Sequence, residues 1–302
     1  MIKKIALIFI SCLSQLSLAQ GVVEVGRAKY RFEDRRFADV FKNSLIIGHS
    51  ISSGLMRNID ATYGKGPGNV LAEDYAEVPV LANIAEGVGT LETGLSKMNR
   101  WILNEQDRAA KAGSDRDIHV MNRHFERSSV IVGVDALYMA ASFNECEDYG
   151  DQGLVSILDQ FVQKTHSADK VLILGNVPKE DRSTFSSLAK LVLPEMNESC
   201  RQLINSALVQ SCTTERHCYI VDLESLVNTL NRTGQLVLKD GTILKDNPSF
   251  LGRLMGRQVR PDGVNMSDQG VQVIVEEILG KLAANPPRFR QGPEAPAVRR
   301  PH

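Results

Sequence analysis

Short apolar runs alternate along this chain with longer segments in which apolar residues recur every three or four positions. The runs are rich in Val, Ile and Leu and are bounded by polar or turn residues, which is typical of strands buried on both faces of a parallel sheet. We predict such strands at residues 44–48, 78–85, 128–137, 170–178 and 218–226.

The segments between and after these runs have the spacing of amphipathic helices. Helices are predicted at residues 91–111, 154–167, 196–212 and 267–284. Asp240 and Gly241 separate two short apolar runs and predict a hairpin turn. Because strands alternate with helices, we expect an α/β fold, with a doubly wound parallel sheet in a three-layer α/β/α sandwich.

The two ends of the chain differ from its middle. Residues 1–19 are expected to be a signal peptide, because Lys3 and Lys4 precede a short apolar core and small residues end at Ala19. This core is shorter than the roughly 20 residues of a membrane-spanning helix, and no later segment is apolar enough to cross a bilayer. We therefore expect a secreted or periplasmic protein without a transmembrane segment. Its single domain is predicted at residues 20–284, followed by a disordered Pro- and Arg-rich tail at 285–302.

Charge and cysteine content narrow the function classes. The net charge is −1, which gives no electrostatic reason to expect nucleic acid or an anionic membrane surface as a partner. An even number of cysteines remains after the signal peptide, and in an exported protein this predicts two disulfides of undecided pairing, with buried free thiols as the alternative. These cysteines are Cys146, Cys200, Cys212 and Cys218. Without a CxxC pair or a histidine cluster of zinc-site spacing, we expect no metal and no cofactor.

The stretch SLIIGHSISSGL, residues 44–55, carries the candidate chemistry. An apolar run ends at Gly48, and Ser50 follows one residue later. Some hydrolases present their nucleophile in this way, as an exposed hydroxyl that follows a strand and a glycine. A serine hydroxyl is a weak nucleophile, so Ser50 needs an adjacent base to accept its proton.

The order of these elements, and the short motifs at their ends, resemble those of the SGNH or GDSL-type hydrolases, a family of esterases, lipases and carbohydrate deacetylases. The resemblance extends from about Ser44 to Leu282. It implies a flavodoxin-like sheet and a reaction in which an acyl ester of a lipid or a glycan is hydrolysed. Most of the mature chain is covered, but through four short motifs only. In chain order these are GHSIS (48–52), NIAEGVGTLETGL (83–95), VIVGVDALY (130–138) and RPDGVNMSDQG (260–270).

The resemblance also assigns roles to individual residues. Ser50 lies at the position of the nucleophile, and Asp262 at that of the triad acid. The oxyanion hole would be formed by the backbone N–H of Ser50 together with a glycine of the second motif, either Gly87 or Gly89.

Two family positions carry other residues in this chain. Asn265 occupies the position of the catalytic histidine, and Asp135 that of the asparagine that donates to the oxyanion. A carboxamide cannot act as a base, and an ionised carboxylate offers only acceptors. His49, next to Ser50, is the alternative base. We therefore keep two hypotheses: a serine hydrolase with a degenerate triad, and a catalytically inactive binding protein for a glycan, lipid or protein.

Overall fold

The structure is a computed structural model. It describes residues 21–25, 28–32, 44–48, 51, 55, 95, 98–99, 125–126, 128–181, 195–246, 259–260, 266 and 268–287.

A parallel sheet lies at the centre of the described part of the chain. Its strands are adjacent in the order β3-β4-β5-β6, and neighbouring strands pair in parallel, Ser44 beside Val130 and Val130 beside Val171. Their bounds are Ser44–Ile46 (β3), Val130–Gly133 (β4), Val171–Gly175 (β5) and Cys218–Val221 (β6). Four of the predicted strands are thereby confirmed in place, and the one predicted at 78–85 lies outside the described residues.

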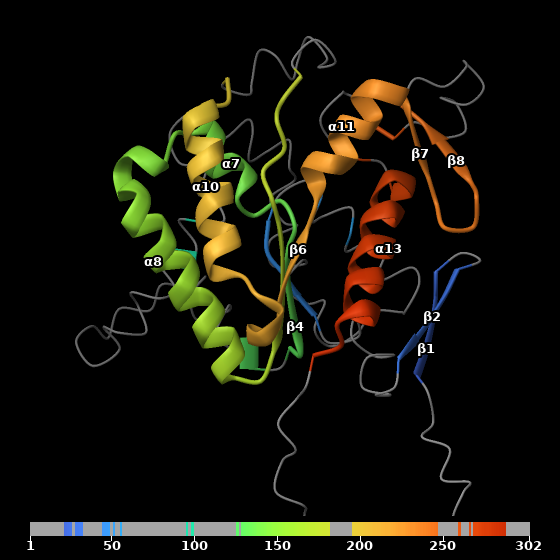
Figure 1. The fold of residues 1–302 in the computed structure, drawn as a ribbon, viewed down its shortest axis with the longest axis horizontal. Helices are drawn as coiled ribbons and strands as arrows, with labels where there is room; N and C mark the ends of the chain where they lie inside the picture. Colours follow the sequence, from blue (N-terminus) through green and yellow to red (C-terminus); the bar gives the residue numbers. More distant parts are fainter. Residues whose placement is uncertain are drawn as a thin grey trace, which may run out of the picture.

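Helices cover both faces of this sheet, which gives an α/β fold compatible with a three-layer α/β/α sandwich (Figure 1). Alternate strand residues enter different cores: Val130 and Val132 face one, and Ile131 faces the other. Each buried aliphatic side chain contributes about 1.5–3 kcal/mol to stability. One face carries α7 (Tyr138–Ser142), α8 (Cys146–Ser167) and α10 (Glu198–Ser211), and the other α11 (Leu223–Thr233) and α13 (Asp268–Ala284).

The ends of several strands differ from their predicted positions, in one case because of a helix cap. The strand predicted at 218–226 ends at Val221, since the carboxylate of Asp222 accepts the backbone N–H of Ser225 at 3.0 Å and starts α11. That helix was not predicted. It ends at Thr233 and is capped by Gly234, whose φ is 66°. The strands predicted at 128–137 and 170–178 are likewise shorter, at Val130–Gly133 and Val171–Gly175.

Two antiparallel hairpins accompany the sheet. The predicted turn at Asp240 and Gly241 is confirmed, because β7 (Gln235–Val237) pairs with β8 (Ile243–Lys245). A second hairpin, β1 (Gly21–Val25) with β2 (Ala28–Phe32), was not predicted. Its sequence mixes charged with apolar residues and lacks the continuous apolar run of a strand buried on both faces.

Disulfides tie α10 at both of its ends. Cys146–Cys200 joins the start of α8 to the start of α10, with 5.5 Å between the Cα atoms. Cys212–Cys218 joins the residue after α10 to the first residue of β6, with 5.0 Å between the Cα atoms. The prediction of two disulfides is confirmed and the pairing is now decided. Such bonds fit an oxidising, extracytoplasmic compartment.

The remaining predictions on targeting concern other parts of the chain. The predicted signal peptide at 1–19 lies outside the described residues, as do residues 288–302 of the tail predicted at 285–302. None of the described helices combines the length and the apolar character needed to cross a membrane.

Candidate functional site

The carboxyl edge of the sheet is where open α/β proteins bind their ligands. Along the first strand, the pairing with β4 continues one residue past β3, because the N–H of Ile47 donates to the carbonyl of Val132 at 2.8 Å. The chain then bends at Gly48, whose φ is 144°. Residues with a Cβ rarely adopt this backbone conformation, so the glycine before His49 and Ser50 is a conformational requirement.

Asp135 lies at the same edge, two residues beyond β4, and it contacts the chain just after Ser50. The backbone N–H of Ile51 donates to Oδ2 of Asp135 at 2.8 Å. Asp135 is only 3% exposed, and Ile51 has a helical backbone conformation. The structure therefore brings together the first and third motifs of the resemblance, which are 84 residues apart in the chain.

In this contact Asp135 acts as a hydrogen-bond acceptor. The family asparagine is expected to donate toward an oxyanion, whereas the Asp135 carboxylate receives a backbone N–H and adds negative charge. An asparagine could keep this contact through its own side-chain oxygen. The carboxylate therefore anchors the chain after Ser50 through a charge-assisted hydrogen bond.

A pair of substitutions tests this anchor. Asp135→Ala should lower the free energy of unfolding by about 1.5–3 kcal/mol, because it removes a charge-assisted hydrogen bond from a partly buried backbone N–H. Asp135→Asn should cost less, since the amide oxygen can still accept. Urea unfolding gives both values, and amide exchange at Ile51 should accelerate in the alanine variant only. Equal exchange at Ile51 in wild type and Asp135→Ala would contradict the assigned contact.

Most of the sequence-predicted site residues lie outside the described part of the chain. Asp135 is the predicted site residue whose surroundings the structure describes. The others are His49, Ser50, Gly87, Gly89, Asp262 and Asn265.

The histidines in the described residues lie at the opposite edge of the sheet. His217 directly precedes β6, and its carbonyl accepts the N–H of Leu172 at 2.9 Å. His166 lies near the end of α8, and the two imidazole rings pack edge to face with centroids 5.1 Å apart. A four-residue strand spans about 13 Å, which separates this pair from the edge where Asp135 lies. Neither ring is a base for that site.

The amino edge also holds two lysines that pack on Phe125. The Lys170 Nζ lies 4.9 Å from the ring centroid and donates to the carbonyl of Ser128, and the Lys164 Nζ lies 5.8 Å from the same ring. Burial lowers the pKa of both groups, that of Lys164 to about 8. These contacts fix the turn before β5 and account for the lysines structurally.

Polar side chains at the ends of β5 and β6 form a hydrogen-bonded set that was not predicted from the sequence. The side-chain amide of Asn176 donates to Oδ1 of Asp222 at 3.0 Å and accepts the N–H of Glu224 at 3.0 Å. The N–H of Asp222 donates to Oε1 of Glu277 on α13 at 2.8 Å. The available signal was an Asn or Asp directly after an apolar run. These bonds hold the ends of β5 and β6 against α11 and α13 at the carboxyl edge of the sheet.

The segment that leads to Asp262 is anchored by Arg260. Its guanidinium donates to both carboxylate oxygens of Asp246, through Nε at 3.2 and 3.1 Å and Nη2 at 2.5 Å, and to Oδ1 of Asn231 at 2.9 Å. Arg260 is 5% exposed. This ion pair holds the chain at Arg260 beside the end of β8.

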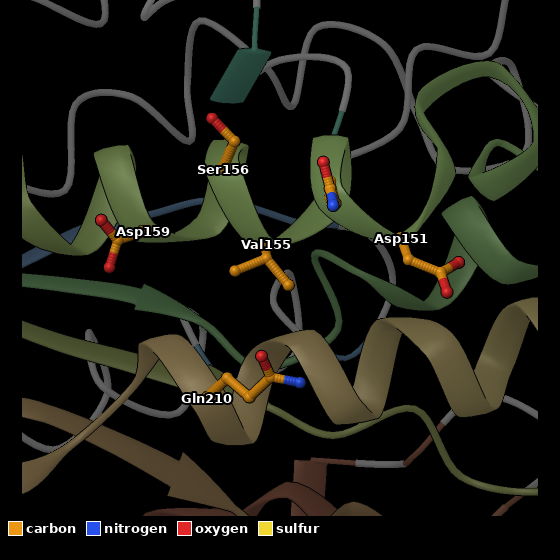
Figure 2. A pocket seen from close by; sticks show the side chains of 6 residues that line it. Asp151, Val155, Ser156, Asp159 and Gln210 are labelled. Carbon is orange, nitrogen blue, oxygen red and sulfur yellow. The ribbon is translucent and has the colours of Figure 1, made fainter.

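A shallow depression of about 430 Å³ lies between α8 and α10 (Figure 2). Its polar side chains form structural contacts. The Ser156 hydroxyl accepts from Gln160 at 2.9 Å, and Asp159 forms an ion pair with Arg216. The lining residues are Asp151, Gln152, Val155, Ser156, Asp159 and Gln210. No histidine lines it, so it does not pair a nucleophile with an imidazole base. Within the described residues there is also no cluster of three or more His, Cys, Asp or Glu that could hold a metal.

Comparison of the chain with protein-family models, with curated proteins and with solved structures found no match. The SGNH resemblance therefore depends on the residues themselves. The contact between Ile51 and Asp135 is the structural observation that bears on it most directly.

Proposed function

We propose that this protein is an exported SGNH-type serine hydrolase with a degenerate triad, which deacylates a carboxyl ester or an acylated glycan at the carboxyl edge of its sheet. The observation that carries the proposal is the hydrogen bond from Ile51 to Asp135, because it joins the first and third motifs at the edge where such folds bind ligands. The two disulfides support an extracytoplasmic place of action.

In this proposal each residue has a stated role. Ser50 attacks the acyl carbonyl, and the backbone N–H groups of Ser50 and of Gly87 or Gly89 hold the oxyanion. Asp262 orients the base. The carboxamide of Asn265 cannot accept the serine proton, so His49 is the remaining candidate base near the nucleophile. Loss of a triad base lowers the rate by several orders of magnitude, and we expect slow turnover.

A second candidate, a binding protein without turnover, is favoured by a specific observation. Asp135 accepts a hydrogen bond at the position from which the family donates one, and its charge opposes an oxyanion. In addition, the described imidazoles lie at the other edge of the sheet. Such a protein would use the same edge to bind a glycan, a lipid or a protein.

Turnover of a short-chain acyl ester by the purified protein separates the two functions. Wild type should be slow, Ser50→Ala inactive, and Asn265→His faster than wild type by about 10² or more, because a general base contributes about 10²–10⁴. Asn265→Gln is the matched control, since it changes the side chain without supplying a base. A gain with histidine alone supports the degenerate hydrolase.

Other outcomes decide against it in different ways. Fast wild-type turnover that Ser50→Ala abolishes would show that the triad is not degenerate. No turnover in wild type or in Asn265→His would favour the binding protein.

A further inference from the structure

Glu276 is a buried acidic residue on α13 that the proposed chemistry does not use. It is 3% exposed, and its Oε2 accepts the backbone N–H of Lys239, in the turn of the β7–β8 hairpin, at 2.8 Å. Its Oε1 is buried and has no hydrogen-bond partner among the described residues. Burial raises the pKa of this carboxyl group, and the nearby Asp240 raises it further, while the bond from the Lys239 N–H and the Lys239 charge act in the opposite direction.

The same hairpin is docked on the helical layer by apolar side chains. Leu236, Leu238 and Leu244 are buried and belong to the core that α13 lines through residues such as Ile274 and Ile278. The hairpin and α13 lie side by side in Figure 1. The Glu276 carboxyl group therefore forms the polar part of an otherwise apolar contact between hairpin and helix.

The far end of the hairpin holds the segment that leads to the last motif. The N–H of Val259 donates to the carbonyl of Lys245 at 3.2 Å, and Arg260 pairs with Asp246 directly after β8. Arg260 is followed by Pro261 and Asp262. A change in how the hairpin docks would reach this segment through the hydrogen bond from Val259 to Lys245 and the ion pair of Arg260 with Asp246.

Other ionisable groups near α13 are engaged elsewhere or lie beyond the described side chains. The Tyr219 hydroxyl on β6 donates to the carbonyl of Asn285, and on α13 itself Glu277 pairs with Lys281 at 3.5 Å. The strand β2 also packs on α13, and it carries Lys29 and Arg31, whose side chains lie outside the described part. Lys239 and Asp240 of the hairpin turn are the described charges from a neighbouring element that act on Glu276.

We propose that the β7–β8 hairpin is a pH-responsive support for the segment leading to Asp262, with the buried Glu276 carboxyl group as its sensor. A carboxyl group whose pKa is higher in the docked state than in water favours docking when protonated. The stabilisation is fully present below the ordinary value of 4.5 and is lost as the pH rises through the raised value. Acidification therefore tightens the hairpin, and the relevance to Asp262 depends on the proposed function.

Amide hydrogen exchange on the full chain tests this without any substrate. The reporters are Leu238, Gly241 and Asp246, whose N–H groups donate within the hairpin and at its base, and Val259, which reports the attached segment. After correction for the intrinsic exchange rate, opening in wild type should increase by about threefold or more from pH 5 to pH 8. Glu276→Gln keeps an acceptor for Lys239 and should abolish this dependence.

Glu147→Gln, at an exposed position of α8, is the matched control and should behave as wild type. A flat profile in wild type, or an unchanged profile in Glu276→Gln, would overturn the sensor. If exchange depended on pH at the hairpin amides but not at Val259, the proposed support of the attached segment would be wrong. If Glu276→Gln does not fold, the carboxyl ¹³C shift of Glu276 in wild type must titrate above the ordinary value for the proposal to stand. Because no ester is used, these outcomes are independent of whether the protein is a hydrolase.

Discussion

Replacing Gly175 with alanine is expected to lower the free energy of unfolding by about 3 kcal/mol or more, because no space exists for a methyl group there. A Cβ at this position would lie 2.0 Å from the carbonyl oxygen of Val134 and 2.9 Å from its carbonyl carbon. Both are backbone atoms, so a rotamer change cannot relieve the clash. Either the end of β5 or the turn before Asp135 would have to move.

The measurement is equilibrium urea unfolding, with Gly280→Ala as control. At Gly280, inside α13, the nearest atom to a new Cβ is the flexible end of Lys239 at 3.3 Å. Alanine there should stabilise the helix by about 0.5–1 kcal/mol, since glycine is the poorer helix former. If both variants had the same stability, the close approach of β5 to Val134 would be wrong. Because Val134 precedes Asp135, Gly175→Ala should also disturb the contact with Ile51.

Removing the Cys146–Cys200 disulfide is expected to cost about 4 kcal/mol, and removing Cys212–Cys218 only about 2 kcal/mol. The reason is the length of chain that each bond closes in the unfolded state, where the sequence separations are 54 and 6 residues. Paired alanine substitutions, compared by urea unfolding under oxidising conditions, give both values. All four cysteines are buried, so the two pairs of substitutions can be compared directly.

The order of the two losses is the decisive point. A larger loss for the short loop would show that local packing around Cys212, and not the entropy of the unfolded chain, dominates. Full stability in a strong thiol reductant would show that neither bond supports the fold.

Apolar runs predicted the sheet well and the strand ends poorly. Val130 to Gly133 and Val171 to Gly175 lie inside their predicted runs, because strands buried on both faces must be apolar at every position. The run at 218–226 was predicted as a single strand, yet it contains a strand and the start of a helix. One carboxylate at Asp222 makes that division, and an apolar pattern does not detect a cap.

Among the candidate site residues, Asp135 is the one that the structure describes, and its hydrogen-bond partner could not be predicted from the sequence. The order of motifs singled out Asp135, and its chemistry predicted that the ionised carboxylate offers only acceptors. Which donor it accepts from depends on where residue 51 lies in space, and that donor is a backbone N–H. The anchors at Arg260 and Glu276 carried no recognisable motif, because each acts through partners that are 14 to 37 residues away.

By itself the sequence determined the α/β alternation, the class of fold that follows from it, and the hairpin turn. These are properties of composition and short-range periodicity, and local interactions suffice to specify them. Only the tertiary structure decided the cysteine pairing, the contact between Asp135 and Ile51, and the exclusion of any side chain at Gly175. Those features depend on which distant backbone atoms pack together, and close packing of the whole core sets that.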